Sequence, residues 1–224
     1  WDVDKDGKIL RYEGDNPRWP QEYVKADEAD VKKAESAEVR ASTQVADKVA
    51  QALGKSEPIT WQQLFKWADE AYGGTQAQGR YTPKDAYDAL EIGINKYLYD
   101  QTFLTANPAT QDTAAARKTI EALKSRILEN IPTQSKRTEE QDEFQQFSTP
   151  PPFAFLANWV ANIGEGDTVL EPSAGTGNLA TFAKIAGADV VMNELSKRRA
   201  QLLRSLNLGP VYTENAEFLN STLP

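Results

Sequence analysis

The residues best suited to bind a ligand lie in a loop of small side chains between residues 171 and 178. An apolar stretch, Val169-Leu170, leads into Glu171-Pro172, and the loop that follows contains Gly175 and Gly177. Glycines allow a tight turn and let the backbone approach a ligand closely. The N–H groups at the start of a following helix can bind polar groups of a cofactor. The same glycine spacing occurs in dinucleotide-binding loops, so the glycines alone do not identify the cofactor.

The acid ahead of the glycines separates two kinds of cofactor. Nicotinamide enzymes usually run an apolar strand straight into the glycines, whereas Glu171-Pro172 comes first here. Methyltransferases place an acid at this position, where it can attract the cationic methionine end of S-adenosylmethionine. The loop therefore favours S-adenosylmethionine over a nicotinamide cofactor.

Three further motifs flank the loop in sequence order. They are Gln146-Phe147-Ser148-Thr149-Pro150-Pro151 one helix upstream, Asn193-Glu194-Leu195-Ser196 after a second strand, and Glu214-Asn215-Ala216 after a third. Together with the loop, this arrangement resembles the adenine-N6 DNA methyltransferases. In that family the upstream motif contacts the methionine moiety, an acid near the position of Glu194 binds the ribose hydroxyls, and an Asp or Asn after the third strand touches the adenine ring.

The resemblance implies an α/β fold, the first half of a Rossmann-like class I methyltransferase sheet preceded by an α-helical region. Residues 143–224 look closest to methyltransferase domains of very large bacterial and phage proteins that also carry a strawberry-notch-type helicase. The implied cofactor is S-adenosylmethionine. The residues that the resemblance places around it are Phe147, Ser148, Thr149, Pro150, Glu171, Pro172, Ser173, Ala174, Gly175, Thr176, Gly177, Asn178, Glu194, Leu195, Asn215 and Ala216.

The catalytic motif of that family is not found among these residues. Amino-N6 methylation uses an Asn or Asp followed by Pro-Pro and an aromatic residue, which bind the target amine and stack on the flipped base. Pro151-Pro152-Phe153 resembles the tail of this motif, but Pro150 stands where Asn or Asp is required. We interpret this run as the start of a helix and assign no catalytic residue.

Two functions follow from these motifs. The first is the cofactor-binding part of a DNA adenine-N6 methyltransferase whose catalytic loop lies beyond residue 224. The second is a non-catalytic methyltransferase-like scaffold or interaction module within a large multidomain phage or bacterial protein. An Asn-Pro-Pro-aromatic motif further along the parent sequence would favour the first.

A motif near the N-terminus has the spacing of an EF-hand calcium loop. Its ligands would be Asp2, Asp4, Asp6, Lys8 and Glu13. The stretch Gly14-Asp15-Asn16-Pro17 is unfavourable for the outgoing helix of an EF-hand. We therefore favour a β-hairpin that turns at Asp6-Gly7, and we assign no metal.

The amino-acid composition excludes several kinds of protein and of site. The chain has 224 residues, 40% of them hydrophobic and 26% charged, and lacks an apolar run long enough to span a membrane, so we expect a cytoplasmic globular protein. It has no Cys and no His, which excludes zinc sites built from these ligands and the cysteine nucleophile of cytosine-C5 methylation. A net charge of −8 argues against autonomous DNA binding, so we expect regions outside this chain to hold DNA.

The elements that must position the loop follow from periodicity and capping residues. We expect an irregular or hairpin segment over 1–26, a helical region over 27–130, a linker over 131–146, and the methyltransferase half over 147–224. The helical region should be a separate unit with Leu64, Trp67, Leu90 and Ile94 in its core. In the last segment helices alternate with strands at 168–170, 189–192 and 211–212, which indicates a parallel sheet.

We also expect two features of the surface, at the sheet edge and at two basic clusters. In a complete methyltransferase fold the first strand lies mid-sheet, so we expect its outer edge to be covered by the remainder of a larger polypeptide or by a partner chain. The basic clusters Lys136-Arg137 and Lys197-Arg198-Arg199 are interpreted as solvated surface.

Overall fold

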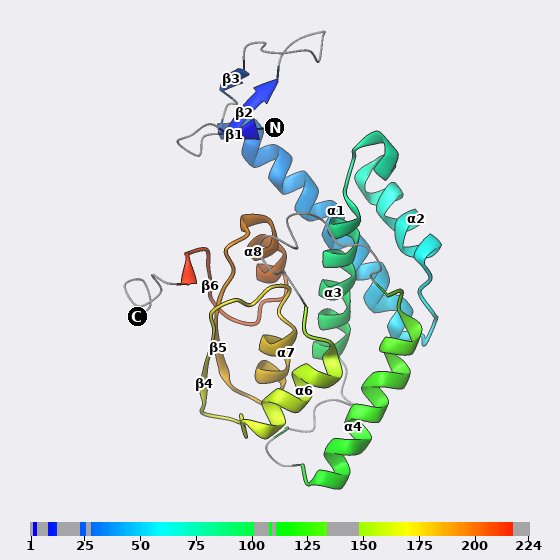
Figure 1. The fold of residues 1–224 in the computed structure, drawn as a ribbon, viewed down its shortest axis with the longest axis vertical. Helices are drawn as coiled ribbons and strands as arrows, with labels where there is room; N and C mark the ends of the chain where they lie inside the picture. The colour runs from blue at the N-terminus through cyan, green and yellow to red at the C-terminus, as the bar shows by residue number, and fades with distance from the viewer. Residues whose placement is uncertain are drawn as a thin grey trace. The chain divides into compact units, whose positions relative to one another are not determined.

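A computed structural model describes residues 2–3, 9–12, 23–25, 28–100, 108, 111–133 and 148–216, with side chains from residue 37 onward. The fold is mixed α/β and mostly helical, with a small parallel sheet. The chain divides into two compact units, Trp1–Glu38 and Val39–Pro224, whose boundary falls within the first helix. Each unit is treated separately below (Figure 1).

The first unit contains a three-stranded antiparallel sheet. Strands β1 (Asp2–Val3) and β2 (Ile9–Tyr12) pair antiparallel with Val3 opposite Ile9, which agrees with a hairpin. The turn expected at Asp6-Gly7 lies outside the described residues. Strand β3 (Tyr23–Lys25) pairs with β2 and was not predicted. Of the five residues of the calcium motif, Asp4, Asp6, Lys8 and Glu13 lie outside the described residues, and only the backbone of Asp2 is described.

Four helices occupy the first half of the chain. They are α1 (Glu28–Gly54), α2 (Trp61–Tyr72), α3 (Pro83–Asp100) and α4 (Thr113–Arg126), with short 3₁₀ turns η1 (Gln76–Gln78) and η4 (Leu128–Asn130). The Thr60 hydroxyl caps α2 by accepting the Gln63 N–H at 3.2 Å. Asp112 caps α4, because its side chain accepts the Ala115 N–H at 2.8 Å and so starts the helix at residue 113.

Helices and strands alternate in the second half. They are α6 (Pro151–Val160), β4 (Thr168–Glu171), α7 (Asn178–Ile185), β5 (Asp189–Asn193), α8 (Lys197–Arg204) and β6 (Val211–Tyr212). The three strands are parallel in the order β4-β5-β6, with Val169 opposite Val190. This confirms the parallel sheet predicted from the alternation.

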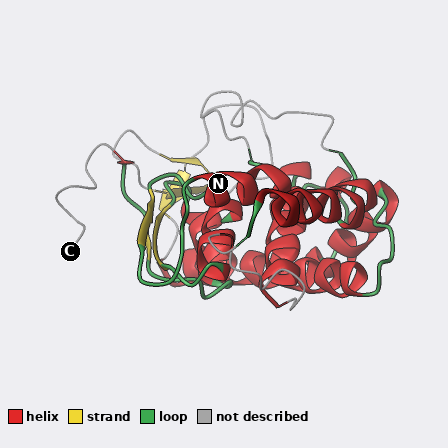
Figure 2. Cartoon of the chain, turned by 90° about the horizontal axis from the view of Figure 1, so that it is seen from below, coloured by secondary structure: helices red, strands yellow, loops and turns green. Residues whose placement is uncertain are grey.

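The sheet is covered on one side and β4 forms its edge. Val169, Val190 and Met192 pack into an apolar cluster with the α7 and α8 side chains Ala183, Leu202 and Leu203. Figures 1 and 2 show the described helices of this unit on one side of the strands. Leu170, whose side chain points to the other face, is 46% exposed. Among the described residues β4 pairs only with β5, so its outer edge is unpaired within that part of the chain, and the covering element that we expected stays a prediction.

The helical region and the α/β segment share one core, in place of the separate helical unit that we expected. Leu64, Leu90 and Ile94 belong to one buried cluster with Phe155 of α6 and Phe182 of α7, and Trp67 packs against its rim. The Phe155 and Phe182 rings meet edge to face, with centroids 5.8 Å apart. The reason is that α3 is buried on most of its surface, from Lys84 to Leu98, and so needs neighbours on several sides.

At Gly93, α3 packs closely against α1. A Cβ at this position would lie 2.5 Å from the Val49 Cβ and 2.6 Å from the Ala46 carbonyl oxygen. We therefore expect Gly93→Ala to lower the free energy of unfolding by about 1–3 kcal/mol, because the two helices must separate. Gly54→Ala is the control, since a Cβ there meets nothing within 4 Å. Urea unfolding that gave both variants the same stability would contradict this close crossing.

Candidate ligand site at the strand ends

The loop between β4 and α7 depends on glycine at two positions. Gly175 and Gly177 have φ values of 58° and 92°, in the left-handed region that other residues rarely adopt. A Cβ on Gly177 would also lie 2.6 Å from Leu203 Cδ1 of α8. Gly177 thus sets both the turn into α7 and its close packing on α8.

The upstream motif meets the start of α7. The Asn178 side-chain amide donates to the Ser148 hydroxyl and to the Thr149 carbonyl, both at 2.8 Å. The other polar side-chain atom of Asn178, Oδ1, is a buried acceptor with no partner among the described residues. Pro150 precedes α6, which begins at Pro151, so the proline run starts a helix as interpreted. Phe147 lies outside the described residues.

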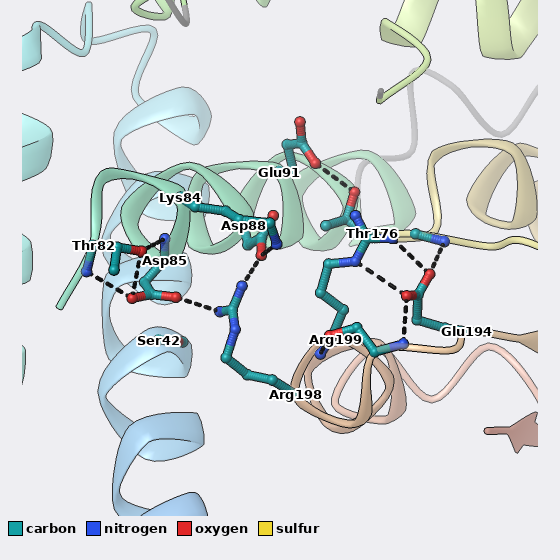
Figure 3. A network of polar contacts seen from close by, with 12 residues as sticks. Ser42, Thr82, Lys84, Asp85, Asp88, Glu91, Thr176, Glu194, Arg198 and Arg199 are labelled. Atoms are coloured by element: carbon teal, nitrogen blue, oxygen red, sulfur yellow. Dashed lines mark hydrogen bonds and ion pairs between the residues drawn. The ribbon is translucent and has the colours of Figure 1, made fainter. Parts of the chain in front are cut away.

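Glu194, the residue directly after β5, contacts the glycine loop. This carboxylate is 3% exposed; its Oε2 accepts the Gly175 N–H at 2.9 Å and its Oε1 accepts the Ser196 N–H at 2.9 Å. Arg199 donates to both oxygens, from Nε at 3.3 Å and from Nη2 at 2.8 Å (Figure 3). Four donors therefore occupy a group with about four acceptor positions.

Asn193 ties the ends of the three strands together. Its side-chain amide donates to the carbonyls of Pro172, after β4, and of Glu214, after β6, at 3.0 and 2.9 Å. Its Oδ1 accepts the Glu214 N–H at 2.9 Å, and its backbone carbonyl accepts the Ala174 N–H at 2.8 Å. Sequence reasoning noted Asn193 in the motif but assigned it no role.

Helix α3 supplies two residues that sequence reasoning missed. The Thr176 hydroxyl donates to Glu91 Oε2 at 2.6 Å (Figure 3). The Asn95 side-chain amide donates to the Thr176 carbonyl at 2.8 Å. Glu91 and Asn95 are four residues apart and so share one helix face. The only sequence signal was this pair of polar residues in a helix that is otherwise rich in apolar side chains.

Two carboxyl groups of the site are hard to ionise. Burial raises the pKa of Glu91 to about 7, and the nearby Asp88 carboxylate adds to the rise. Hydrogen bonds from Thr176 and Ser148 and the Arg199 charge lower the pKa of Glu91 in part. Burial also raises the pKa of Glu171. Both groups would be stabilised in their charged form by a cationic ligand.

The basic cluster at the start of α8 is not the solvated surface that we expected. Across the α3–α8 contact, Arg198 pairs with Asp85 at 3.0 Å and with Asp88. Within α3, Lys84 pairs with Asp88 at 3.1 Å. Arg199 pairs with Glu194, and only Lys197 is exposed. The reason is that α8 packs on the acidic start of α3. Lys136-Arg137 lies outside the described residues.

The structure thus brings most of the predicted site residues to one end of the sheet. Glu171 ends β4, Pro172, Ser173 and Ala174 follow it, and Asn215 and Ala216 follow β6. Leu195 is 57% exposed beside Glu194. Within the part of the chain that the structure describes, no group of three or more Asp and Glu residues is placed to hold a metal ion.

Comparison with protein-family models, with curated proteins and with solved structures finds no match to this chain. Among the described helices, none has the length and apolar character to cross a membrane.

Arg199 is expected to be essential for stability because it neutralises a buried carboxylate. Arg199→Met should lower the free energy of unfolding by about 3 kcal/mol, since Glu194 would remain buried without its cation. Lys197→Met, an exposed position on the same helix, should change it by less than about 0.5 kcal/mol. Adding Glu194→Gln to Arg199→Met should recover part of the loss. Equal urea midpoints for the two single variants would show that the pair contributes nothing.

Proposed function

We propose that this chain binds S-adenosylmethionine at the carboxyl ends of β4, β5 and β6, as the cofactor-binding part of a DNA adenine-N6 methyltransferase. The observation that carries the proposal is the convergence of the three flanking motifs, which are separated in the sequence, on the glycine loop. Ser148 and Thr149 meet Asn178, Glu194 meets Gly175, and Glu214 is tied to the loop through Asn193. Ligands of open parallel sheets bind at this end of the strands.

The chemistry of the site suits a cationic cofactor. Glu171 ends the strand that leads into the loop, and Asn178 Oδ1 at the start of α7 is a buried acceptor without a partner among the described residues. A carboxylate attracts the sulfonium and ammonium groups of the methionine end, and an amide oxygen accepts hydrogen bonds from the ammonium. When bound, the cofactor would supply the methyl group. The chain's own residues would hold its methionine end and exclude water around it.

The proposal extends to the fold and to the partners of this chain. The order β4-β5-β6 with helices α7 and α8 on one face supports the first half of a Rossmann-like class I methyltransferase sheet. The open β4 edge and the exposed Leu170 support a covering element, either further chain of a larger cytoplasmic protein or a partner. Because the chain is acidic, DNA would be held by regions outside these residues.

Ligand binding tests the proposal directly. Isothermal titration calorimetry of the 224-residue chain should give one site for S-adenosylmethionine or S-adenosylhomocysteine and no response to NAD. Glu171→Gln should weaken S-adenosylmethionine binding by about tenfold, as the loss of one charged contact predicts. Glu165→Gln, which alters an exposed acid ahead of the same strand, should leave binding unchanged. Tight NAD binding with no response to either sulfur ligand would overturn the proposal.

A non-catalytic scaffold is the second candidate, and one observation favours it. Both Glu194 oxygens already accept hydrogen bonds from Arg199 and from backbone N–H groups, so a ribose hydroxyl would have to displace one of these donors. A well-folded chain that binds neither S-adenosylmethionine nor S-adenosylhomocysteine would support this candidate.

The methyl-transfer step is expected to need residues that this chain lacks. Without an Asn or Asp and the adjacent Pro carbonyl to bind the amine, the adenine nitrogen stays a poor nucleophile, and such losses cost orders of magnitude in rate. We therefore expect the 224 residues to bind cofactor but not to transfer labelled methyl groups to adenine-containing DNA. Transfer at a rate typical of enzymes would show that the catalytic residues lie within this chain.

A further inference from the structure

Helix α3 reaches the glycine loop at Thr176, the residue between the two glycines. Thr176 is 3% exposed. Its carbonyl accepts the Asn95 amide at 2.8 Å, and its hydroxyl donates to Glu91 at 2.6 Å. These contacts join residues 81 and 85 positions apart in the chain.

We propose that Glu91 and Asn95 are positioning residues that hold the glycine loop in its ligand-binding conformation, and that this hold depends on whether Glu91 carries a proton. The ligand part of this inference rests on the proposed function. The coupling between α3 and the loop does not.

The Asn95 contact fixes one peptide plane of the loop. In a trans peptide the carbonyl of one residue and the N–H of the next point in opposite directions. The Thr176 carbonyl is held by Asn95, and the Gly177 N–H is held by the Ala174 carbonyl at 2.8 Å. The peptide plane between Thr176 and Gly177 is therefore held from both sides, although glycine itself has wide conformational freedom.

The hydrogen bond between Glu91 and Thr176 depends on pH, because the Glu91 carboxyl can take up a proton. The ionised carboxylate accepts hydrogen bonds from the Thr176 and Ser148 hydroxyls, whereas a protonated carboxyl must itself donate one. The charged groups around it are Asp88 on α3 and Arg199 on α8. The pKa of Glu91 is about 7, so the contacts with Thr176 and Ser148 change between about pH 6 and pH 8.

The direction of the effect follows from charge. Above pH 7 the carboxylate is ionised, accepts both hydroxyls and favours a cationic ligand. Below pH 7 proton uptake weakens these contacts. Because the ionised fraction of a group with this pKa rises about tenfold between pH 6 and pH 8, affinity for S-adenosylmethionine should rise by up to about tenfold over that range.

Amide NMR of the chain without ligand tests the coupling. The ¹H–¹⁵N signals of Gly175, Thr176 and Gly177 should titrate together with a midpoint near pH 7. Glu91→Gln should abolish that midpoint, while Asp100→Asn, which alters an exposed acid at the end of the same helix, should retain it. Loop signals that do not move near pH 7, or that still move in Glu91→Gln, overturn the inference.

A pair of loop variants separates positioning from simple packing. Thr176→Ser keeps the hydroxyl and should retain the titration of the neighbouring Gly175 and Gly177 signals. Thr176→Val keeps the shape but removes the donor, and should reduce their pH-dependent shifts several-fold. Equal titration in both variants would overturn a role for the Glu91–Thr176 hydrogen bond.

Calorimetry at pH 6 and pH 8 then links the coupling to ligand. The wild-type chain should bind more tightly at pH 8, and Glu91→Gln should show equal affinity at the two values. If the wild-type chain binds no sulfur ligand, the proposed function fails, and the NMR titration still decides the inference about Glu91. Ligand binding with the same pH profile in both chains overturns the inference and leaves the proposed function intact.

Discussion

The hydrogen bond from Asn95 to the Thr176 carbonyl joins α3 to the glycine loop, and the arrangement of the site depends on it. Glycine-rich loops have many accessible backbone conformations, and ordering them costs conformational entropy. In this chain, neighbours on three sides restrict the loop. Asn95 and Glu91 hold Thr176, Glu194 holds Gly175, and Asn193 holds Ala174. The site is therefore a joint product of the helical region and the sheet.

A buried ionic network fixes how α3 and α8 meet. Lys84, Asp85, Asp88 and Arg198 have side chains at most 21% exposed, and each is paired with a group of opposite charge. Removing charges from water is costly, and pairing recovers that cost without adding much net stability. The network therefore acts mainly on specificity: with α3 at another register, these charges would be buried without partners. Since α8 also carries Arg199, the same register places the cation that neutralises Glu194.

The charged groups around the glycine loop favour some kinds of ligand over others. Glu91 and Glu171 have pKa values raised by burial, and Glu194 is already neutralised by Arg199. Among the described residues, the site thus has carboxyl groups that a cationic ligand would stabilise, and its cation Arg199 is already paired with Glu194. This favours the methionine end of S-adenosylmethionine over the pyrophosphate of a dinucleotide. Among the described residues β4 pairs only with β5, and Leu170 on β4 is exposed.

The sequence by itself determined the elements and the gathering of the motifs. Thr60 and Gly73 bound α2 through local capping contacts, which can be read from neighbouring residues. The motifs after β4, β5 and β6 could be expected together because the carboxyl ends of parallel strands lie at one edge. Only the tertiary structure decided the roles of Glu91, Asn95, Arg198 and Arg199. Their partners lie on elements that are distant in the chain or reached across a turn. Their contacts exist because α3 packs against both the glycine loop and α8. Periodicity and composition carry no information about such crossings, since the same helix pattern can pack at many registers.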